Sequence, residues 1–456
     1  HLALIGHEAR SVRMKAFVAL LQTLVDAVEA SPVLGPSAIQ FYVDSVFDSA
    51  INLTAAANEK LYTIILQLWA GINTKMSPLR DVAMRFSWFL GALVVKSAAL
   101  QLAQDGKIPI HQVATPAPGT FKLPDPLNPK TPRTGPSENR AKWFPKPFYD
   151  ALSDFFNSTS IATRQYHVAD SLSSYVAHRF TVHIASFVAD LYAIVDRGHL
   201  NKIVLSYLDK MANFEDTVSG VPSANSFDHT ATRCLFFKVL SQHPHFYLWN
   251  LPDPQDFKSG ADMIRLWNTR HVLTSAFLDT FKTSFLPKSS ETSRDLILDT
   301  LTDFIYCVDS REELNDTPND IATTLSPAVS ASDTLSPRDL SFPRTTKSRI
   351  ASLYLPYVYY LIDKIEFFES PGFTSRERQK ALIPFVWILK HTPIDVLARY
   401  WERDSEKRIF TMFKLCTYAI NLFELASDRL IRIQREAIPT PNPLFFLQQQ
   451  EISFTE

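Results

Sequence analysis

KSRIASLYLPYVYYLID, residues 347–363, is almost entirely apolar between its flanking charges. Apolar or aromatic side chains surround it on every side, at Ile350, Leu353, Tyr354, Leu355, Tyr357, Val358, Tyr359, Tyr360 and Leu361. A helix of this kind is buried by neighbouring helices. Pro356 cannot donate to the carbonyl oxygen of Ser352, so a kink is predicted there. Because the apolar run is shorter than the roughly 20 residues of a membrane span, Lys347–Asp363 is predicted to be a kinked core helix.

The composition narrows the classes of fold and function. The chain has 456 residues, enough for several small cores or one elongated core, and only 11 glycines. So little glycine disfavours phosphate-binding loops and sheets with many tight turns. With 46 basic and 47 acidic residues, the formal charge is −1. This balance excludes an overall field that attracts nucleic acid or an anionic membrane.

Helical periodicity recurs along the whole chain, and no set of segments alternates with the period of two that strands show. Besides residues 347–363, the predicted helices are Ser11–Ala30, Ile39–Leu53, Leu61–Ile72, Ser77–Ala103, one that starts at Pro147, Ile161–Val195, His199–Met211, Phe227–Leu240, Met263–Phe285, Ser293–Val308, Arg376–Lys390, Pro393–Trp401 and Lys407–Ile433. Helix pairs at intervals of roughly 40 residues are typical of armadillo and HEAT repeats. The predicted fold is therefore all-α, an α-solenoid of armadillo/HEAT-like helix pairs.

Local signals predict how the first helices begin and end. Ser31-Pro32 and Gly35-Pro36 are predicted to separate the first helix from the second. Ser77 is a predicted N-cap and Pro78 suits the first helical position. The helix that starts there is predicted to run to about Ala103 and to stop at Gly106.

Two later helix boundaries are predicted from the same residue types. Gly198 is predicted to be the C-cap of the long helix Ile161–Val195. Thr392 is predicted to cap a helix whose first position is Pro393, with Asp395 near the positive end of that helix.

Two proline-rich stretches interrupt the helices. Lys107–Lys142 and Leu314–Thr346 cannot bury enough apolar area to order themselves, so both are predicted to be flexible surface insertions. A partner peptide in the first is a weaker alternative. In the second, Ser326 and Ser336 each precede a proline and suit proline-directed kinases, and an unmodified loop is an equal alternative. The predicted domains are 1–105, 144–313 and 347–435 as parts of the solenoid, 106–143 and 314–346 as insertions, and 436–456 as an irregular tail.

No constellation of residues in the sequence predicts chemistry. The phosphate-loop, dinucleotide, zinc-protease and paired-cysteine motifs do not occur. The histidine pairs are His178 with His183 and His243 with His245, and neither has a third metal ligand nearby. Asp295, Asp299 and Asp303 recur every four residues, which predicts a solvated helix face. Cys234, Cys307 and Cys416 are predicted to be buried, reduced thiols. No catalytic, cofactor-binding or metal-ligating residue is therefore predicted, and no cofactor.

Three segments, in order, resemble one family. RIASLYLPYVYYLID at residues 349–363 is similar to the Arg-Ile-Ala-x-Leu-Tyr-Leu-Pro helix of the dedicator-of-cytokinesis (DOCK) exchange factors. MRFSWFLGALVVKSAALQLA at Met84–Ala103 resembles that family's Arg-Phe-x-Trp-Phe…Val-Lys-Ser segment. WILKHTPIDVLARYW at Trp387–Trp401 resembles its Leu-Lys…Trp hairpin. The chain is identified as a member of this family, nearest its zizimin-like branches, with a resemblance that covers roughly Met76 to Glu424.

Two shorter segments extend the resemblance. Asp196-Arg197-Gly198 resembles a recurrent Asp-Arg-Gly of the family, and Trp249-Asn250-Leu251-Pro252 fits an extended Leu-Asn-Leu-Pro segment. DOCK proteins are exchange factors for Rho-family GTPases, with a lipid-binding domain, a helical solenoid and a catalytic exchange domain. The exchange domain has no counterpart in this sequence.

The resemblance therefore implies a non-catalytic scaffold. It would space the membrane-binding and exchange domains and offer surfaces for homodimers, adaptor proteins or autoinhibition. A Rho-family GTPase would bind through a domain outside this chain, which begins at His1 inside a predicted helix and is expected to be a fragment. The expected location is the cytoplasm, with recruitment to membranes through other domains, no transmembrane segment and no nucleic-acid partner. The alternatives are an unrelated HEAT/armadillo-type adaptor, for instance in vesicle transport, and a helical enzyme whose site has no recognised motif.

Limited proteolysis tests the predicted insertions. A protease with broad specificity should cut first within Lys107–Lys142 and Leu314–Thr346, because exposed segments outside regular structure are cleaved before packed helices. Mass spectrometry of the earliest fragments locates the cuts. First cuts inside Ile161–Val195 would contradict this division of the chain.

Overall fold

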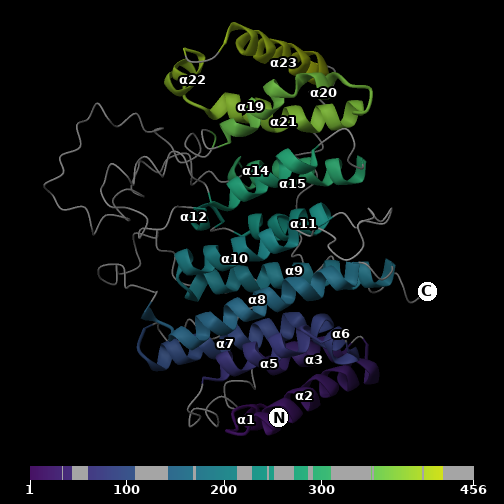
Figure 1. Ribbon diagram of the computed structural model, residues 1–456, viewed down its shortest axis with the longest axis vertical. Coiled ribbons are helices and arrows are strands. Elements are labelled where there is room, and N and C mark those ends of the chain that lie inside the picture. The colour runs from purple at the N-terminus through teal and green to yellow at the C-terminus, as the bar shows by residue number, and fades with distance from the viewer. Residues whose placement is uncertain are drawn as a thin grey trace, which may run out of the picture.

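The computed structural model describes residues 1–32, 34–43, 60–75, 77–107, 142–167, 171–212, 229–243, 246–250, 272–285, 291–309, 351, 354–402 and 405–424. In these residues the secondary structure is helical and contains no strand, which confirms the all-α fold. The helices form an elongated stack, with the N-terminal helices at one end and α19 to α23 at the other (Figure 1). The two proline-rich insertions and residues 436–456 lie outside the described residues, apart from Gly106, Lys107 and 142–143 at the edges of the first insertion.

The N-terminal end consists of α1 (Leu2–Ile5), α2 (Arg10–Ala30) and α3 (Leu34–Phe41). The break at Ser31-Pro32 is confirmed, but Gly35-Pro36 does not interrupt a helix. The backbone amides of Leu34 and Gly35 donate to the side-chain and backbone oxygens of Ser31, so both residues belong to the first turn of α3. A Cβ atom on Gly35 would lie 2.5 Å from the Ala27 carbonyl oxygen. Glycine therefore lets α3 pack closely on α2.

The next helices are α5 (Leu61–Asn73), α6 (Pro78–Arg85) and α7 (Ser87–Gln104). The prediction of one helix from Ser77 to Ala103 is wrong, because α6 and α7 meet at Phe86 with a bend of 64°. The Ser87 hydroxyl donates to the Met84 carbonyl oxygen at 2.8 Å, and such side-chain bonds compete with the helical ladder.

Gly106 ends α7 as predicted. Its φ is +71°, and the amides of Gly106 and Lys107 donate to the carbonyl oxygens of Ala103 and Leu102, which is the Schellman arrangement. Among the described residues, no single helix is long and apolar enough to cross a membrane. The bent pair α6 and α7 meets that test together, by length and composition only.

The long helix predicted over Ile161–Val195 is two helices, α8 (Lys146–His167) and α9 (Ser171–Ile194). The rings of Phe155 and Phe156 on α8 lie 5.8 and 6.4 Å from the ring of Phe187 on α9. An uninterrupted helix would hold these residues far apart, so the chain has to reverse between them. Apolar periodicity continues across the reversal because both helices have a buried face, and for that reason it did not reveal the break.

The prediction that Gly198 is a C-cap is wrong, because Gly198 lies in the first turn of α10 (Arg197–Ala212). The Asp196 side chain accepts a hydrogen bond from the His199 backbone amide at 3.0 Å. A carboxylate in this position satisfies one of the free amides at the start of a helix. Asp196 is therefore the N-cap of α10.

The central part contains α11 (His229–Ser241), α12 (Phe246–Trp249), α14 (Val272–Ser284) and α15 (Glu291–Asp309). The last part contains α19 (Leu355–Asp363), α20 (Ile365–Glu369), α21 (Ser375–His391), α22 (Ile394–Trp401) and α23 (Glu406–Glu424). Pro356 lies in the first turn of α19, where its missing amide costs no hydrogen bond. Of the predicted helix before α19, only Ala351 and Tyr354 are among the described residues, so the predicted kink stays a prediction. Leu361 is 1% exposed, which confirms that this helix is buried; Ile350 and Leu353 lie outside the described residues.

Thr392 has a different role from the one predicted. Its hydroxyl donates to the Ile388 carbonyl oxygen at 2.7 Å, so the side chain closes α21 instead of capping α22. The backbone amides of Val396 and Leu397 in α22 donate to the carbonyl oxygen of Pro393, which precedes the helix. Thr374 is the side-chain cap in this region: together with Glu377 it forms a capping box at the start of α21.

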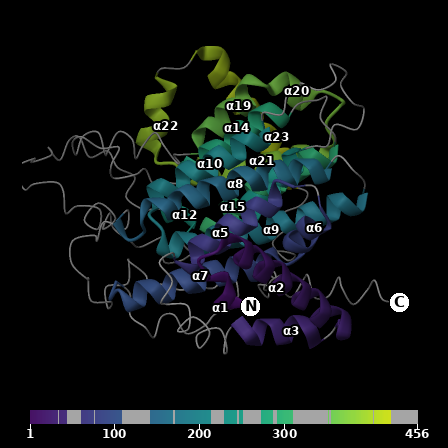
Figure 2. The same cartoon turned by 60° about the horizontal axis from the view of Figure 1, so that its bottom comes forward.

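The helices pack in two rows. One row runs α5, α8, α10, α14 and α19, and the other runs α7, α9, α11, α15 and α21. Each helix contacts its neighbours along its own row and its partner in the other row, while α23 packs on both α19 and α21. Figures 1 and 2 both place α1, α2 and α3 together at one end of this stack. This nearest-neighbour arrangement is an α-solenoid.

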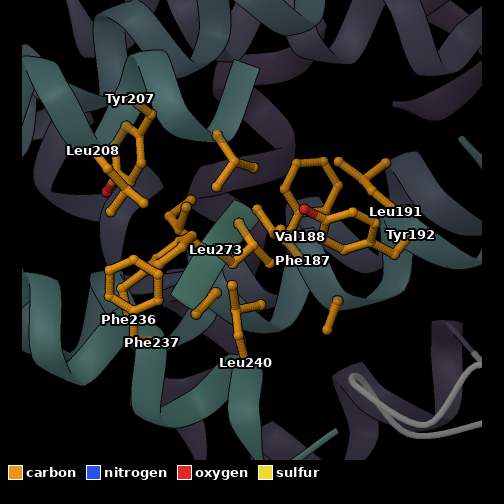
Figure 3. Close-up of a cluster of buried hydrophobic side chains, with 14 of the residues drawn as sticks. Phe187, Val188, Leu191, Tyr192, Tyr207, Leu208, Phe236, Phe237, Leu240 and Leu273 are labelled. Carbon is orange, nitrogen blue, oxygen red and sulfur yellow. The ribbon is translucent and has the colours of Figure 1, made fainter. Parts of the chain in front are cut away.

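The core continues from one helix pair to the next. In Figure 3 the side chains of Phe187 and Leu191 on α9, Tyr207 on α10, Phe236 on α11 and Leu273 on α14 gather in one cluster. All five are at most 2% exposed. The ring centroids of Tyr207 and Phe236 lie 5.6 Å apart, within the range of favourable aromatic pairs. The stack therefore has one continuous core.

Substitution of Leu361 by Asp tests whether stability is local along the stack. Losing the buried leucine should cost roughly 2–5 kcal/mol, and the buried carboxylate adds to this. Hydrogen exchange should show lost protection that spreads from α19 into α21, while α5 and α7 keep theirs. Val386→Asp on α21 is the control, because Val386 is 39% exposed. An unchanged melting curve for Leu361→Asp would contradict the burial of α19.

Candidate functional site

Buried polar side chains join successive helix pairs near the N-terminal end. The side-chain amide of Asn73 on α5 donates to the Thr159 hydroxyl on α8 at 3.1 Å. Ser87 on α7 and His183 on α9 form a hydrogen bond of 2.8 Å between Oγ and Nδ1. All four residues are buried, where an unpaired polar group is costly. These pairs therefore favour one register of the α8–α9 pair on the α5–α7 pair.

The Ser87–His183 pair has the residue types of a nucleophile and its base but not the setting. Ser87 is 1% exposed and His183 is 6% exposed, so a substrate does not reach either side chain. Burial, with a smaller contribution from the Arg179 charge, lowers the pKa of His183 to about 3. The imidazole is therefore neutral at physiological pH and acts as a hydrogen-bonding core residue.

The structure does not bring the predicted histidines together. His178 lies on α9 and is half-buried, and burial lowers its pKa. His243 stacks on Trp249 with ring centroids 4.4 Å apart, and His245 lies outside the described residues. Within the part of the chain that the structure describes, no group of three His, Cys, Asp or Glu side chains could hold a metal ion. Cys234 is buried, Cys416 is half-buried, and both are free thiols.

The segment around Trp249 and Asn250 is a hydrogen-bonded junction. Tyr192 on α9 donates to the Asn201 side-chain oxygen on α10, and Asn201 donates to the Trp249 carbonyl oxygen at 3.1 Å. The rings of Tyr192 and Trp249 stack 4.4 Å apart. Trp249 ends the short helix α12 instead of lying in an extended segment as predicted.

Asn250 continues this junction toward the C-terminal half. It is fully buried, and its side-chain oxygen accepts a hydrogen bond of 2.8 Å from the Thr274 backbone amide on α14. The Thr274 hydroxyl lies 3.4 Å from the Tyr354 hydroxyl, just before α19. Buried polar side chains therefore connect α9 to the start of α19 through α10, α12 and α14.

Asp295, Asp299 and Asp303 on α15 do not form a simply solvated face. Lys380 on α21 lies 3.2 Å from Asp295 and 2.8 Å from Asp299, and Lys238 on α11 lies 3.1 Å from Asp303. Burial raises the pKa of Asp303, while Lys238 opposes this shift. The acidic side chains of α15 therefore face basic partners on the helices before and after it in the row.

Arg294 and Glu377 form a buried ion pair between α15 and α21. Their side chains are 6% and 0% exposed, and Arg294 Nε lies 2.7 Å from Glu377 Oε1. Arg294 also donates to the Gly372 carbonyl oxygen at 3.0 Å and lies over the Phe373 ring. Glu377 accepts from the Thr374 amide and hydroxyl.

The Glu377 carboxylate stays ionised because of these donors. Burial is the largest single effect and would raise its pKa, but the hydrogen bonds from Arg294 and Thr374 outweigh it, so the pKa is lowered. A buried charge is tolerated only with such partners. Sequence patterns could reveal the Thr374–Glu377 capping box, but the partner of Glu377 on α15 is 83 residues away and has no local signal.

The exposed apolar side of α23 is the candidate interaction site. It consists of Phe410, Phe413 and Ile420, which are 71, 57 and 64% exposed; Ile394 on α22 is separately 75% exposed. The opposite side of α23 is packed, with Met412, Leu415 and Ala419 buried. Arg408 pairs with Asp363 of α19, and Lys414 and Tyr418 bind Glu369 of α20. These contacts hold α23 in one orientation and leave its apolar stripe in solvent.

Comparison with known proteins gives a family match for the first part of the chain. Residues 2–222, just under half of the chain, match the family model described as "DOCK6-11, TPR domain". The match includes the segment at Met84–Ala103 and Asp196-Arg197-Gly198, and it extends to residues before Met76, where the sequence offered no recognisable motif. The segments at 349–363 and 387–401 lie beyond it. The searches of curated proteins and of solved structures found no match.

Substitution of Glu377 by Gln tests the buried ion pair. Because the folded pKa of Glu377 is lowered, its contribution to stability is present at neutral pH and is lost as the pH falls below the unfolded value. Glu377→Gln leaves Arg294 without its charge partner and should lower the unfolding free energy by about 3–5 kcal/mol at neutral pH. The difference from the wild type should shrink on acidification, as followed by urea denaturation.

Glu366→Gln on α20 is the matched control, because Glu366 is exposed and its loss should leave stability nearly unchanged. Equal stability of Glu377→Gln and the wild type at neutral pH would contradict a structural role for the pair. A constant difference across the acidic range would contradict the pKa direction.

Proposed function

The chain belongs to the DOCK family, and from this premise we propose that it is a non-catalytic scaffold segment of a guanine nucleotide exchange factor for Rho-family small GTPases. Its role is to hold the membrane-binding and exchange domains of the whole protein at a set distance. A Rho-family GTPase binds a different part of that protein. The family match supports this role over that of an unrelated HEAT or armadillo adaptor.

One observation carries this proposal: the two helix rows run from α5 to α21 with one continuous core. A stack in which each pair is bonded to the next resists bending more than domains on a flexible linker do. The buried polar pairs support the same role, because their side chains bind one another across neighbouring helices. These pairs are Ser87–His183, Tyr192–Asn201 and Arg294–Glu377. Such side chains position helices and do not contact a substrate.

The finer parts of the proposal have separate support. The matching family model names DOCK6-11, which supports a place near the zizimin-like branches. A cytoplasmic location, with membrane recruitment through other domains, follows from the role of an exchange factor. The exposed stripe on α23 supports a docking surface near the C-terminal end of the stack.

A nucleotide-release assay tests the non-catalytic role. Purified chain, added in excess to Rho-family GTPases loaded with a fluorescent nucleotide, should leave the release rate at its intrinsic value. EDTA, which removes the bound magnesium ion, is the positive control for release. Acceleration that rises with the concentration of the chain, and disappears after the chain is heat-denatured, would contradict the proposal.

A further inference from the structure

The short segment Phe246–Asn250, which consists of α12 and the residue after it, lies between two halves of the stack. The N-terminal half runs from α5 to α11, and the C-terminal half runs from α14 to α21. In Figure 1, α12 lies between the levels of α10 and α14. Asn250 is fully buried, so the polar atoms of its side chain need partners within the protein.

Asn250 caps α14 from a distant part of the chain. The first amides of a helix have no partner within that helix. In α14, the Val272 amide donates to the backbone carbonyl oxygen of Asn250 at 3.0 Å, and the Thr274 amide donates to its side-chain oxygen at 2.8 Å. The side-chain amide of Asn250 donates to the Phe246 carbonyl oxygen at 2.9 Å. One residue therefore joins α12 to the start of α14.

The same segment also binds the N-terminal half. The Trp249 ring stacks on Tyr192 of α9, and the Trp249 carbonyl oxygen accepts a hydrogen bond from Asn201 of α10. On the other side, the ring of Phe246 lies 5.3 Å from that of Phe304 on α15. The segment therefore has directional contacts with helices of both halves.

The contact between α11 and α15 joins the halves in a different way. The rings of Phe237 on α11 and Phe304 on α15 lie 6.2 Å apart, and apolar contacts of this kind are non-directional. The ion pair of Lys238 and Asp303 beside them is 36% exposed on each side, so it adds little restraint. Hydrogen bonds weaken steeply when their angle changes. The bonds of Asn250 therefore restrict rotations that the contact between α11 and α15 allows.

We propose that Asn250 is the positioning residue that fixes the angle between the two halves of the stack. This inference rests on the proposed scaffold role, because a spacer needs a set angle as well as a set length. Without the Asn250 side chain, the Thr274 amide and the Phe246 carbonyl oxygen lose their partners. The C-terminal half then rotates on the contact between α11 and α15, and the distance between the halves is no longer fixed.

Pulsed electron paramagnetic resonance on the full chain tests the proposal. Nitroxide labels on keto amino acids, introduced at the exposed positions Asp154 of α8 and Val386 of α21, report the distance between the halves. The wild type should give one narrow distribution. Asn250→Ala should give a broad distribution with the helical circular dichroism signal retained. In hydrogen exchange, its Thr274 amide should exchange about twofold to thirtyfold faster, the range expected from losing a helix cap.

Asn73→Ala is the matched control. Asn73 is as fully buried as Asn250 and also has a hydrogen-bonded side chain, but it lies on α5, outside the labelled span. Its loss should lower the melting temperature and leave the distance distribution narrow. Thr274→Val is a milder second variant, because it removes only the hydroxyl between Asn250 and Tyr354. It should broaden the distribution in the same direction.

An unchanged distribution in Asn250→Ala overturns the proposal. Equal broadening in Asn73→Ala also overturns it, because the effect is then a general loosening of the stack. If Asn250→Ala does not fold, the result for Thr274→Val decides, and an unchanged distribution in that variant overturns the proposal. The nucleotide-release rate tests the scaffold role separately and does not depend on these results.

Discussion

A helix with apolar residues on two opposite sides must be covered from both sides, and the whole stack depends on this constraint. Phe187 on α9 illustrates it. Its ring lies 6.2 Å from Trp69 of α5 and 5.8 Å from Phe155 of α8, while a Cβ on Gly91 of α7 would approach it to 3.2 Å. Each helix therefore supplies the cover for the next, and the order of the helices along the rows follows their order in the sequence.

Burial alone does not select one register, because apolar side chains tolerate sliding. The polar junctions supply the missing specificity. Lys96 on α7 reaches the Val43 carbonyl oxygen after α3 at 2.7 Å, and Tyr357 on α19 donates to the Ala381 carbonyl oxygen on α21 at 2.7 Å. A shift of either helix by one turn would leave these buried groups unpaired, at a cost of about 1–3 kcal/mol each. The residues that carry the family resemblance thus connect neighbouring helices.

Periodicity and turn chemistry predicted the fold class, because apolar residues recur with the 3.6-residue period of a helix in each of the predicted helical segments. The α2 and α5 helices, the start at Pro78 and the stop at Gly106 all have local signals. Periodicity did not predict where a long apolar run divides into two helices. The α8–α9 reversal and the bend at Phe86 are set by the partners that each helix meets, and such contacts have no signature in a short window.

The same limit applies to the candidate site. Sequence spacing placed Asp295, Asp299 and Asp303 on one face but could not show that Lys238 and Lys380, from two other helices, lie against it. The stripe of Phe410, Phe413 and Ile420 was hidden for a related reason. It reads as an ordinary buried face until the structure shows which side of α23 is already packed.

Native-state hydrogen exchange over a series of denaturant concentrations tests whether stability passes only between neighbouring helices. We expect the α8–α9 pair and the α15–α21 pair to lose protection at different denaturant concentrations, with intermediate values for the helices between them. A single transition, in which all described helices lose protection together with one slope, would contradict it.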